Sequence, residues 1–472
     1  RSAQALSLQA SAAVWATSPV VVTCDPTAVA LAVPRATELG VPVLVLSESA
    51  GPEASASPDA SAGPDSSAGP DVPVGPDAAA AQAPVSAELT RLGTTHVLHV
   101  GPNPPALPGV TVVASPADLP EFAPASPVGD VAGLIDTGAP GRGDGAAALA
   151  TLQAAGVSPI EVGDPDPRVR PADIRAIAAD APAVAIGVGR EFGPDDTFAR
   201  RVAVAATGVQ LPGGGQTVFD DKRYVALYGH PLTGALGVLG EQGPEASVAR
   251  ARKVAAPYED LTDATIVPAF EIIATVAAGT AGKDGNYSNE WDLDVLAPLV
   301  DAAADAGVYV VLDLQSGRSD FLSQAREYEQ LLLEPHVGLA LDPEWRLSGD
   351  QKPMAQIGSV SAAEINETTA WLAELTAAND LPQKMVLLHQ FRTDMITERS
   401  DLHLDRDELA VIVQMDGDGT LGQKLDTWVA LRAEAPRALR FGWKNFYDED
   451  EPMPSPQTTF GIDPQPWWVS YQ

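Results

Sequence analysis

The second half of this 472-residue chain repeats one pattern, in which an apolar run is followed by a stretch of helical periodicity. Continuous apolar runs bounded by turn residues are typical of strands buried on both faces. The runs lie at 224–231, 266–274, 308–317, 337–345, 384–391, 409–419 and 439–450. Seven strand–helix units in about 230 residues predict an α/β fold with a closed (β/α)8 barrel. The eighth strand lies before residue 223 or at the C-terminus, or the barrel has only seven strands.

The first two hundred residues alternate strand-like and helix-like stretches less regularly. The strand-like runs lie at 19–24, 41–48, 95–101, 110–113, 131–136, 157–163 and 183–189. We therefore expect residues 1–200 to form one or two parallel α/β domains. The near-repeats PDASAG, PDSSAG and PDVPVG predict a disordered low-complexity insert at 51–84. A triple glycine predicts a linker at 201–222, which leaves residues 223–472 for the barrel.

Composition excludes several classes of protein. The chain carries 63 acidic and 29 basic residues, a formal charge of −34, which argues against nucleic acid as a partner because phosphates require Lys and Arg. No apolar run reaches the roughly 20 residues of a membrane span, so we expect no transmembrane segment. Cys24 is the only cysteine, which excludes an intrachain disulfide. Because the sequence begins with Arg1, we expect that a signal segment or lipoprotein leader has been removed.

Two motifs in the N-terminal region resemble a known family. LGVPVLVLSE follows a predicted helix, and ELTRLGTTHVLHVGP follows the insert. Over residues 28–115 this order is similar to the type 2 cell-wall-binding repeats of Gram-positive surface proteins. The chain departs from the repeat by its Pro-Asp-rich insert and by the sequence GPNPP. The resemblance implies an extracellular or cell-surface protein that binds a cell-wall or envelope glycan.

Polar side chains gather where the predicted barrel strands end. Sites in such barrels are built from the carboxyl ends of the strands and the loops after them. The candidates are Tyr228, His230, Glu271, Asp313, Gln315, Asp342, Glu344, His389, Gln414, Asp416, Trp443, Lys444 and Asn445. Because parallel strands deliver their carboxyl ends to one rim, we predict that these side chains converge on one site.

Asp342 and Glu344, separated by one proline, suggest glycoside hydrolysis, which needs two carboxyl groups in different protonation states. We predict that Glu344 donates the proton and that its neighbour Asp342 orients the side chain of Glu344. Asp313 or Asp416 would act as base or nucleophile. The substrate would be bound by His230, Glu271, Gln315, His389, Gln414, Trp443, Lys444 and Asn445. Sugar rings would stack on tryptophans: Trp291, Trp345, Trp443, Trp467 and Trp468.

The Asp-x-Glu at a strand end resembles the strand-end acids of barrel glycoside hydrolases. The second half also resembles uncharacterised exported proteins of high-GC Gram-positive bacteria. Together these resemblances imply an exported hydrolase that cleaves glycosidic bonds in an envelope polysaccharide.

Two alternatives stay open. A metal-dependent hydrolase would use ligands from strand ends, namely His230, Asp313, Asp342, His389 and Asp416. The histidines form no H-x-H or H-E-x-x-H pair, so we expect no metal and no cofactor. Under the second alternative, the barrel is a non-catalytic binding or scaffold module. This alternative stays open because a fold alone does not establish chemistry.

Overall fold

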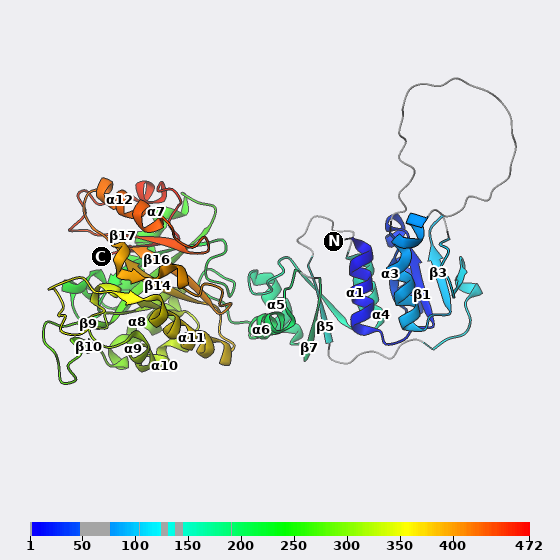
Figure 1. Ribbon diagram of the computed structural model, residues 1–472, viewed down its shortest axis with the longest axis horizontal. Helices are drawn as coiled ribbons and strands as arrows, with labels where there is room; N and C mark the ends of the chain where they lie inside the picture. The colour runs from blue at the N-terminus through cyan, green and yellow to red at the C-terminus, as the bar shows by residue number, and fades with distance from the viewer. Residues whose placement is uncertain (1, 48–75, 103, 124–130, 137–144, 190) are drawn as a thin grey trace, which may run out of the picture. The chain divides into compact units, whose positions relative to one another are not determined.

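The structure is a computed structural model that describes residues 2–47, 76–102, 104–123, 131–136, 145–189 and 191–472. Figure 1 shows its helices and strands. The chain forms two compact units, which are described separately. The first comprises Arg1–Pro167 and Arg175–Val202, and the second comprises Arg168–Ile174 and Ala203–Gln472. Within the described ranges, no helix has both the length and the apolar character needed to cross a membrane.

The first unit contains two parallel sheets. One has the order β2-β1-β3-β4 and the other the order β6-β5-β7. Their strands are β1 (Val20–Cys24), β2 (Val43–Val45), β3 (His96–Val100), β4 (Thr111–Val113), β5 (Val131–Asp136), β6 (Ser158–Val162) and β7 (Val184–Val188). The helices up to residue 206 are α1 (Ala3–Val14), η1 (Pro26–Ala28), α2 (Val29–Leu39), α3 (Pro76–Leu92), η2 (Pro116–Asp118), α4 (Ala146–Ala154), α5 (Pro171–Asp180) and α6 (Asp195–Ala206).

The strands of the first unit form where the apolar runs predict them. All five residues of β1 are buried, as expected for a central strand between two parallel neighbours. The prediction for the insert is wrong at its end, because α3 begins at Pro76 and residues 76–84 are helical. Alanines at this end of the segment favour a helix, and this local propensity was masked by the repeats before it. Residues 51–75 of the predicted insert lie outside the described residues.

The second unit is a closed barrel of eight parallel strands surrounded by helices, which confirms the predicted fold class. The strand order is β8-β9-β11-β12-β14-β16-β17-β18, and β18 pairs with β8 to close the barrel. The strands are β8 (Lys222–Gly229), β9 (Thr265–Ala277), β11 (Tyr309–Leu314), β12 (Val337–Leu341), β14 (Lys384–Gln390), β16 (Leu409–Met415), β17 (Arg440–Asn445) and β18 (Trp468–Tyr471). Of the locations considered for the eighth strand, the C-terminal one is correct.

Short strands and helices complete the second unit. The antiparallel strand β10 (Ser288–Glu290) extends the barrel beside β9, and β13 (Val360–Ser361) pairs with β15 (Ile396–Thr397). The α-helices are α7 (Pro244–Glu259), α8 (Leu293–Ala306), α9 (Phe321–Glu327), α10 (Glu329–Leu332), α11 (Ala362–Ala378), α12 (Leu421–Arg432) and α13 (Pro456–Phe460). The 3-10 helices are η3 (Gly234–Leu236), η4 (Val238–Glu241), η5 (Pro343–Trp345), η6 (Thr393–Met395) and η7 (Arg399–Asp401).

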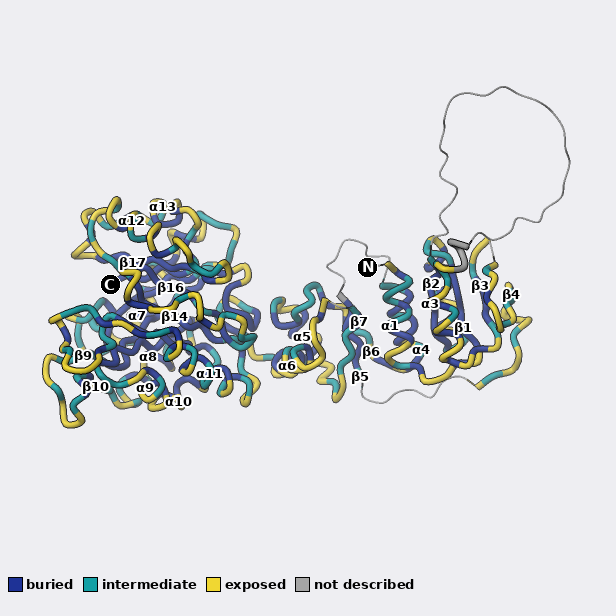
Figure 2. The backbone as a smooth tube through the Cα atoms, in the orientation of Figure 1, coloured by how far each residue is buried: buried dark blue, intermediate teal, exposed yellow. Residues whose placement is uncertain are grey.

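The barrel strands are buried on both faces, whereas the surrounding helices expose one side (Figure 2). Side chains alternate along a strand, so each strand serves two separate cores. In β8, Val225 and Leu227 pack in the cluster that contains the helices, while Tyr224 and Ala226 belong to a cluster inside the barrel. This alternation fixes which residues point into the barrel and therefore which can contribute to a site at its mouth.

We expected a linker at 201–222, but its residues 203–222 belong to the second unit. Its residues Leu211, Val218 and Phe219 pack in the interior cluster at the amino end of the barrel. The triple glycine has backbone angles φ of +82°, +86° and +69°, and a Cβ on Gly215 would lie 2.7 Å from the carbonyl oxygen of Val169. These glycines therefore permit a close turn against the barrel.

Candidate active site

A layer of polar residues lines the inside of the barrel at the carboxyl end of its strands. It continues the inward-facing alternation of each strand by one step beyond the apolar layers. Its members are Tyr228, Glu271, Asp313, Asp342, His389, Gln414, Lys444 and Ser470, and all are buried. Seven of them lie in barrel strands and Asp342 directly follows β12, so the strand-end groups converge as expected.

His389 lies at the centre of this layer. Its Nε2 is 2.6 Å from Glu271 Oε1, and its Nδ1 is 2.9 Å from Asp416 Oδ2. Two further carboxylates approach the ring, since Asp313 Oδ1 lies 3.9 Å from Nε2 and Asp342 Oδ2 lies 4.0 Å from Nδ1. Two short contacts to carboxylates are satisfied only when both ring nitrogens donate, so the arrangement favours the imidazolium.

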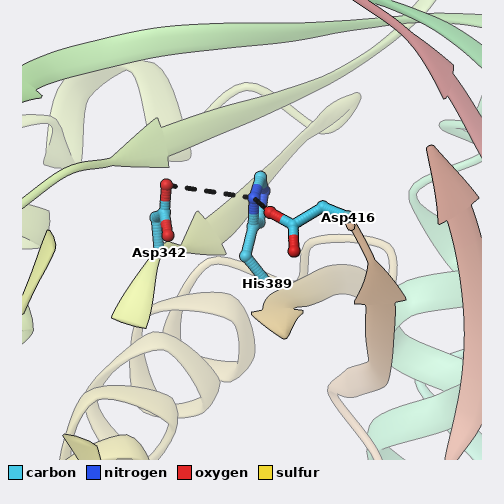
Figure 3. Close-up of side chains that lie close together, drawn as sticks. All are labelled: Asp342, His389 and Asp416. Carbon is cyan, nitrogen blue, oxygen red and sulfur yellow. Dashed lines mark hydrogen bonds and ion pairs between the residues drawn. The ribbon is translucent and has the colours of Figure 1, made fainter. Parts of the chain in front are cut away.

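Asp342, His389 and Asp416 come from the ends of three neighbouring strands, β12, β14 and β16, and face one another (Figure 3). One ligand atom of each lies within 4.8 Å of the others. Asp342 also accepts a 3.0 Å hydrogen bond from the backbone N–H of Glu344 and thereby caps η5. The same aspartate therefore borders the cluster and orients the turn that carries Glu344.

Asp313 is held from the opposite side of the barrel. The hydroxyl of Tyr228 donates a 3.0 Å hydrogen bond to Asp313 Oδ2, and Gln315 Nε2 lies 3.3 Å from the same hydroxyl. The ammonium of Lys444 lies 3.5 Å from the centroid of the Tyr228 ring. Lys444 therefore places a buried positive charge beside Asp313 through a cation–π contact.

The cluster contains more carboxyl groups than cations. In the described part of the chain, the charges that act on one another here include two basic side chains, His389 and Lys444, and five carboxyl groups, Glu271, Asp313, Asp342, Glu344 and Asp416. Burying such an excess of charge is unfavourable unless protons or another cation compensate it. Protons can supply this compensation, because burial raises the pKa of Asp313 to about 6 and that of Asp342 well above its usual range.

His389 responds in the opposite sense. Burial by itself lowers the pKa of an imidazole, but here the charges of Asp313, Glu271 and Asp342 outweigh it. Together with the hydrogen bond to Asp416, they raise the pKa of His389 well above its ordinary value. The imidazolium is thus stabilised by the carboxylates that surround it.

Glu344 lies at the outer edge of this group and is half-buried. Burial, and then the negative charge of Asp416, raise the pKa of Glu344 to about 7, while Lys444 and His389 oppose that shift. A carboxyl group with this pKa is partly protonated near neutral pH and can donate a proton. Asp416 is the negative neighbour with the largest influence on Glu344.

A buried ion pair fixes the end of β17. The ammonium of Lys424 bonds both carboxylate oxygens of Asp450, at 2.7 and 2.6 Å, and the carbonyl oxygen of Lys444 at 2.7 Å. Asp450 in turn accepts hydrogen bonds from the backbone N–H groups of Phe446 and Gly419. The contact therefore ties the loop after β16 to the strand that carries Lys444.

Some predicted site residues lie elsewhere. Trp443 and Asn445 point outward from β17, where Trp443 packs on Trp428 of α12 and donates a 2.8 Å hydrogen bond from Nε1 to Asn445. Trp467 and Trp468 lie at the amino end of the barrel, opposite the polar layer. Side chains alternate in a strand, so Lys444 points inward while both of its neighbours face the helices.

His230 directly follows β8, at the carboxyl end of the strand. Within the described residues, it forms no hydrogen bond or ion pair with His389 or with the carboxylates around it. Its ring packs on Trp291, with centroids 4.6 Å apart. Within the described part of the chain, His230 Nε2 and Trp291 Nε1 are both buried and have no hydrogen-bond partner. Trp345, in η5, is half-buried.

Ser470 is the one member of the polar layer that sequence reasoning missed. Its hydroxyl accepts a hydrogen bond from Gln414 Nε2. The signal was present as the alternation W-V-S-Y in β18, but a four-residue strand rich in aromatic residues did not stand out as a barrel strand.

No protein-family model matches this chain, and no curated protein matches it. Among solved structures, the chain is similar to the crystal structure of a member of the enolase superfamily from Salmonella Typhimurium, with 12% identity over 65% of this chain and 72% of that chain. The TM-score is 0.22. At that score the likeness carries no argument about activity, so function is argued from the residues of the site.

Proposed function

We propose that the second unit hydrolyses a glycosidic bond at the carboxyl end of its barrel. The observation that carries the proposal is Glu344, whose pKa is raised to about 7 beside the charge of Asp416. Glycoside hydrolysis needs one protonated and one ionised carboxyl group at the scissile bond. A proton donor of this pKa and a neighbouring charged carboxylate are the two groups that the reaction requires.

Glu344 would protonate the leaving oxygen, and Asp416 would act as nucleophile or activate water. Asp416 Oδ2 is held by His389, while Asp416 Oδ1 has no hydrogen-bond partner within the described ranges. Asp313, the other candidate base, also has an oxygen without a partner among the described residues, but it is fully buried and accepts a hydrogen bond from Tyr228, whereas Asp416 is half-buried. The depth of Asp313 favours Asp416 for the reaction and leaves Asp313 to adjust the charge around His389.

The polar edges of His230 and Trp291 support a sugar as the substrate. Both side chains lie beyond the carboxyl ends of barrel strands, and both carry a buried N–H or ring nitrogen without a partner in the described part of the chain. Sugar hydroxyls donate and accept hydrogen bonds, so they would satisfy these atoms, and the indole of Trp345 offers an apolar face for a ring.

The envelope as the location of the substrate rests on the N-terminal motifs. Their similarity to type 2 cell-wall-binding repeats supports an exported chain whose first unit binds a wall polymer. The substrate would then be an envelope polysaccharide near that anchoring site.

The test is release of reducing ends from purified Gram-positive wall polysaccharide and from a panel of aryl glycosides by the full chain. We expect Glu344→Gln to lower kcat/KM about 10³-fold, within the range of a lost general acid, and to leave thermal unfolding unchanged. Glu367→Gln, an exposed substitution on α11, is the matched control and should retain activity. Wild-type rates in Glu344→Gln would exclude the proposal.

A metal-dependent hydrolase is the second candidate, favoured by the geometry of Asp342, His389 and Asp416. One ligand atom of each lies within 4.8 Å of the others. Glu271 forms a hydrogen bond with Nε2 of His389, and such a bond to the second ring nitrogen orients histidine ligands in metal sites. A cation there would replace the proton on His389 Nδ1 and balance the carboxylate excess. These residues would hold the ion, and the ion would supply an activated water.

Chelation separates the two candidates. Under the glycosidase proposal, dialysis against EDTA leaves the activity of the full chain unchanged. Loss of activity on dialysis, with recovery on adding Mn²⁺ or Zn²⁺ to the wild type but not to Asp342→Asn, would establish the metal-dependent mechanism instead.

A further inference from the structure

A cavity of about 610 Å³ lies at the other end of the barrel, with walls from the end of α12, the start of β17 and the segment before β18. Its lining includes three arginines, Arg432, Arg437 and Arg440, together with Phe441 and Trp467. No acidic residue lines it. In a chain of net charge −34, three guanidinium groups around one cavity without a carboxylate are unexpected.

In the described part of the chain these arginines form no ion pair, although the charge of Asp220 acts on Arg440 from a longer distance. Among the described residues, no carboxylate oxygen lies within 4.0 Å of a nitrogen of Arg432, Arg437 or Arg440. Arg432 is half-buried, donates a 3.3 Å hydrogen bond to the carbonyl oxygen of Asp463 and lies over the ring of Trp428. Arg440 is also half-buried, whereas Arg437 is exposed. A half-buried guanidinium that lacks a carboxylate partner is electrostatically unfavourable, and an anion from outside would compensate its charge.

Aromatic rings hold Arg440 in place. Its guanidinium lies 4.9 Å from the centroid of Phe219 and 4.8 Å from that of Trp467. Arg223 lies over the same indole at 3.6 Å, so two cations share one ring. Burial lowers the pKa of Arg440, with Asp220 acting in the opposite direction, and burial and then Arg440 lower that of Arg223. These ring contacts hold the guanidinium of Arg440 beside the cavity, and a guanidinium can bind an anion through two N–H groups at once.

We propose that this cavity binds a small anion, a phosphate or carboxylate group attached to a sugar or other compact ring. Arg440 and Arg437 would bind the anionic oxygens, and the ring would lie against Trp467. The volume is in the range of small-molecule sites. The cavity is separate from the polar layer, which lies at the opposite end of the same strands, so the inference is independent of the proposed hydrolysis.

The test is isothermal titration calorimetry of the full chain at 50 mM salt with three probes. Glucose 1-phosphate and glucuronate carry the two anionic groups on one ring, and glucose is the neutral control. We expect binding of at least one anion, no detectable binding of glucose, and weaker binding at 200 mM salt. The anion that binds more tightly identifies the ligand class.

Variants assign the binding to this cavity. Arg440→Gln should weaken binding of the anion about tenfold or more, and Arg437→Gln, at an exposed position, about threefold to tenfold. Arg326→Gln, an exposed arginine on α9, is the control and should bind as the wild type does. Absence of binding by both anions, or equal affinities in wild type, Arg437→Gln and Arg440→Gln, would overturn the proposal.

Discussion

At the amino end of the barrel the interior is filled by aromatic rings, with Tyr224 packed against Tyr309 at 5.3 Å and against Trp468 at 5.9 Å. At the carboxyl end, the same strands place carboxylates around His389. Burial is nearly complete at both ends, so only the residue types differ. One end gains stability from packing, whereas the other holds charges whose compensation depends on protonation. The comparison indicates that the amino end stabilises the fold and that the carboxyl end sacrifices stability for chemistry.

The largest expected effect is at the carboxyl end. Asp416→Asn should lower kcat/KM on the glycan about 10⁴-fold, because it removes the group proposed to attack or to activate water. The free energy of unfolding should stay the same or rise, since one carboxylate is removed from an acidic excess. Activity assays and urea denaturation of the same preparation check both. Strong destabilisation by Asp416→Asn would contradict the contrast between the ends.

The next effect belongs to the amino end. Trp468→Ala should lower the free energy of unfolding by about 3–5 kcal/mol, because a fully buried ring is lost from a packed layer. Urea denaturation followed by circular dichroism measures it, with the exposed Val429→Ala on α12 as control. The pH dependence of the remaining activity should be that of the wild type. A changed pH profile would mean that the two ends are coupled.

The third prediction concerns stability and pH. Burial raises the pKa of Asp313 from 3.8 to about 6 and that of Glu344 from 4.5 to about 7, so between these limits the folded chain holds protons that the unfolded chain releases. Their contribution to stability is therefore full at low pH and is lost as pH rises through these windows. Asp313→Asn should remove on the order of 2 kcal/mol of this dependence between pH 4 and 7. Equal pH slopes in both proteins would contradict it.

The smallest expected effect is a shift of the pH profile on removal of the positive charge of Lys444. Lys444 lowers the pKa of Glu344 and of Asp313, so Lys444→Met should move the alkaline limb of the kcat/KM profile upward by about half a unit to one unit. The exposed Lys253→Met on α7 is the matched control. A downward shift of the limb would show that Glu344 is not the group that titrates.

Seven of the eight barrel strands were predictable, because each is a long apolar run with turn residues after it. β18 was not, since it has four residues and its two neighbouring tryptophans resembled a sugar-stacking platform. Several predicted strands end too late, as at 439–450 against Arg440–Asn445, because polar loop residues continue the pattern after pairing ends. The strand predicted at 266–274 ends too early, since β9 continues to Ala277. The segment 201–222 was predicted to be a linker because glycine permits a close turn as well as flexibility.

The candidate site was predictable as a set of strand ends but not as a geometry. The sequence could place Asp342 and Glu344 at a strand end, yet the 2.6 Å contact of His389 with Glu271 joins residues 118 positions apart. The sequence also did not predict which side chains of β17 point into the barrel. Lys444 points inward and belongs to the polar layer, whereas Trp443 points outward. Direction depends on register, and register is set by neighbouring strands.

The buried ion pair of Lys424 and Asp450 affects which substitutions inactivate the protein. Lys424 belongs to an outer helix, and its ammonium bonds the backbone carbonyl oxygen of Lys444 rather than the side chain of that residue. Replacing either partner leaves the other as an isolated buried charge and loosens that strand end. A screen for inactive alleles would therefore recover Lys424 and Asp450 together with the carboxylates around His389. The structure distinguishes the two groups, because Lys424 and Asp450 act by holding the end of β17.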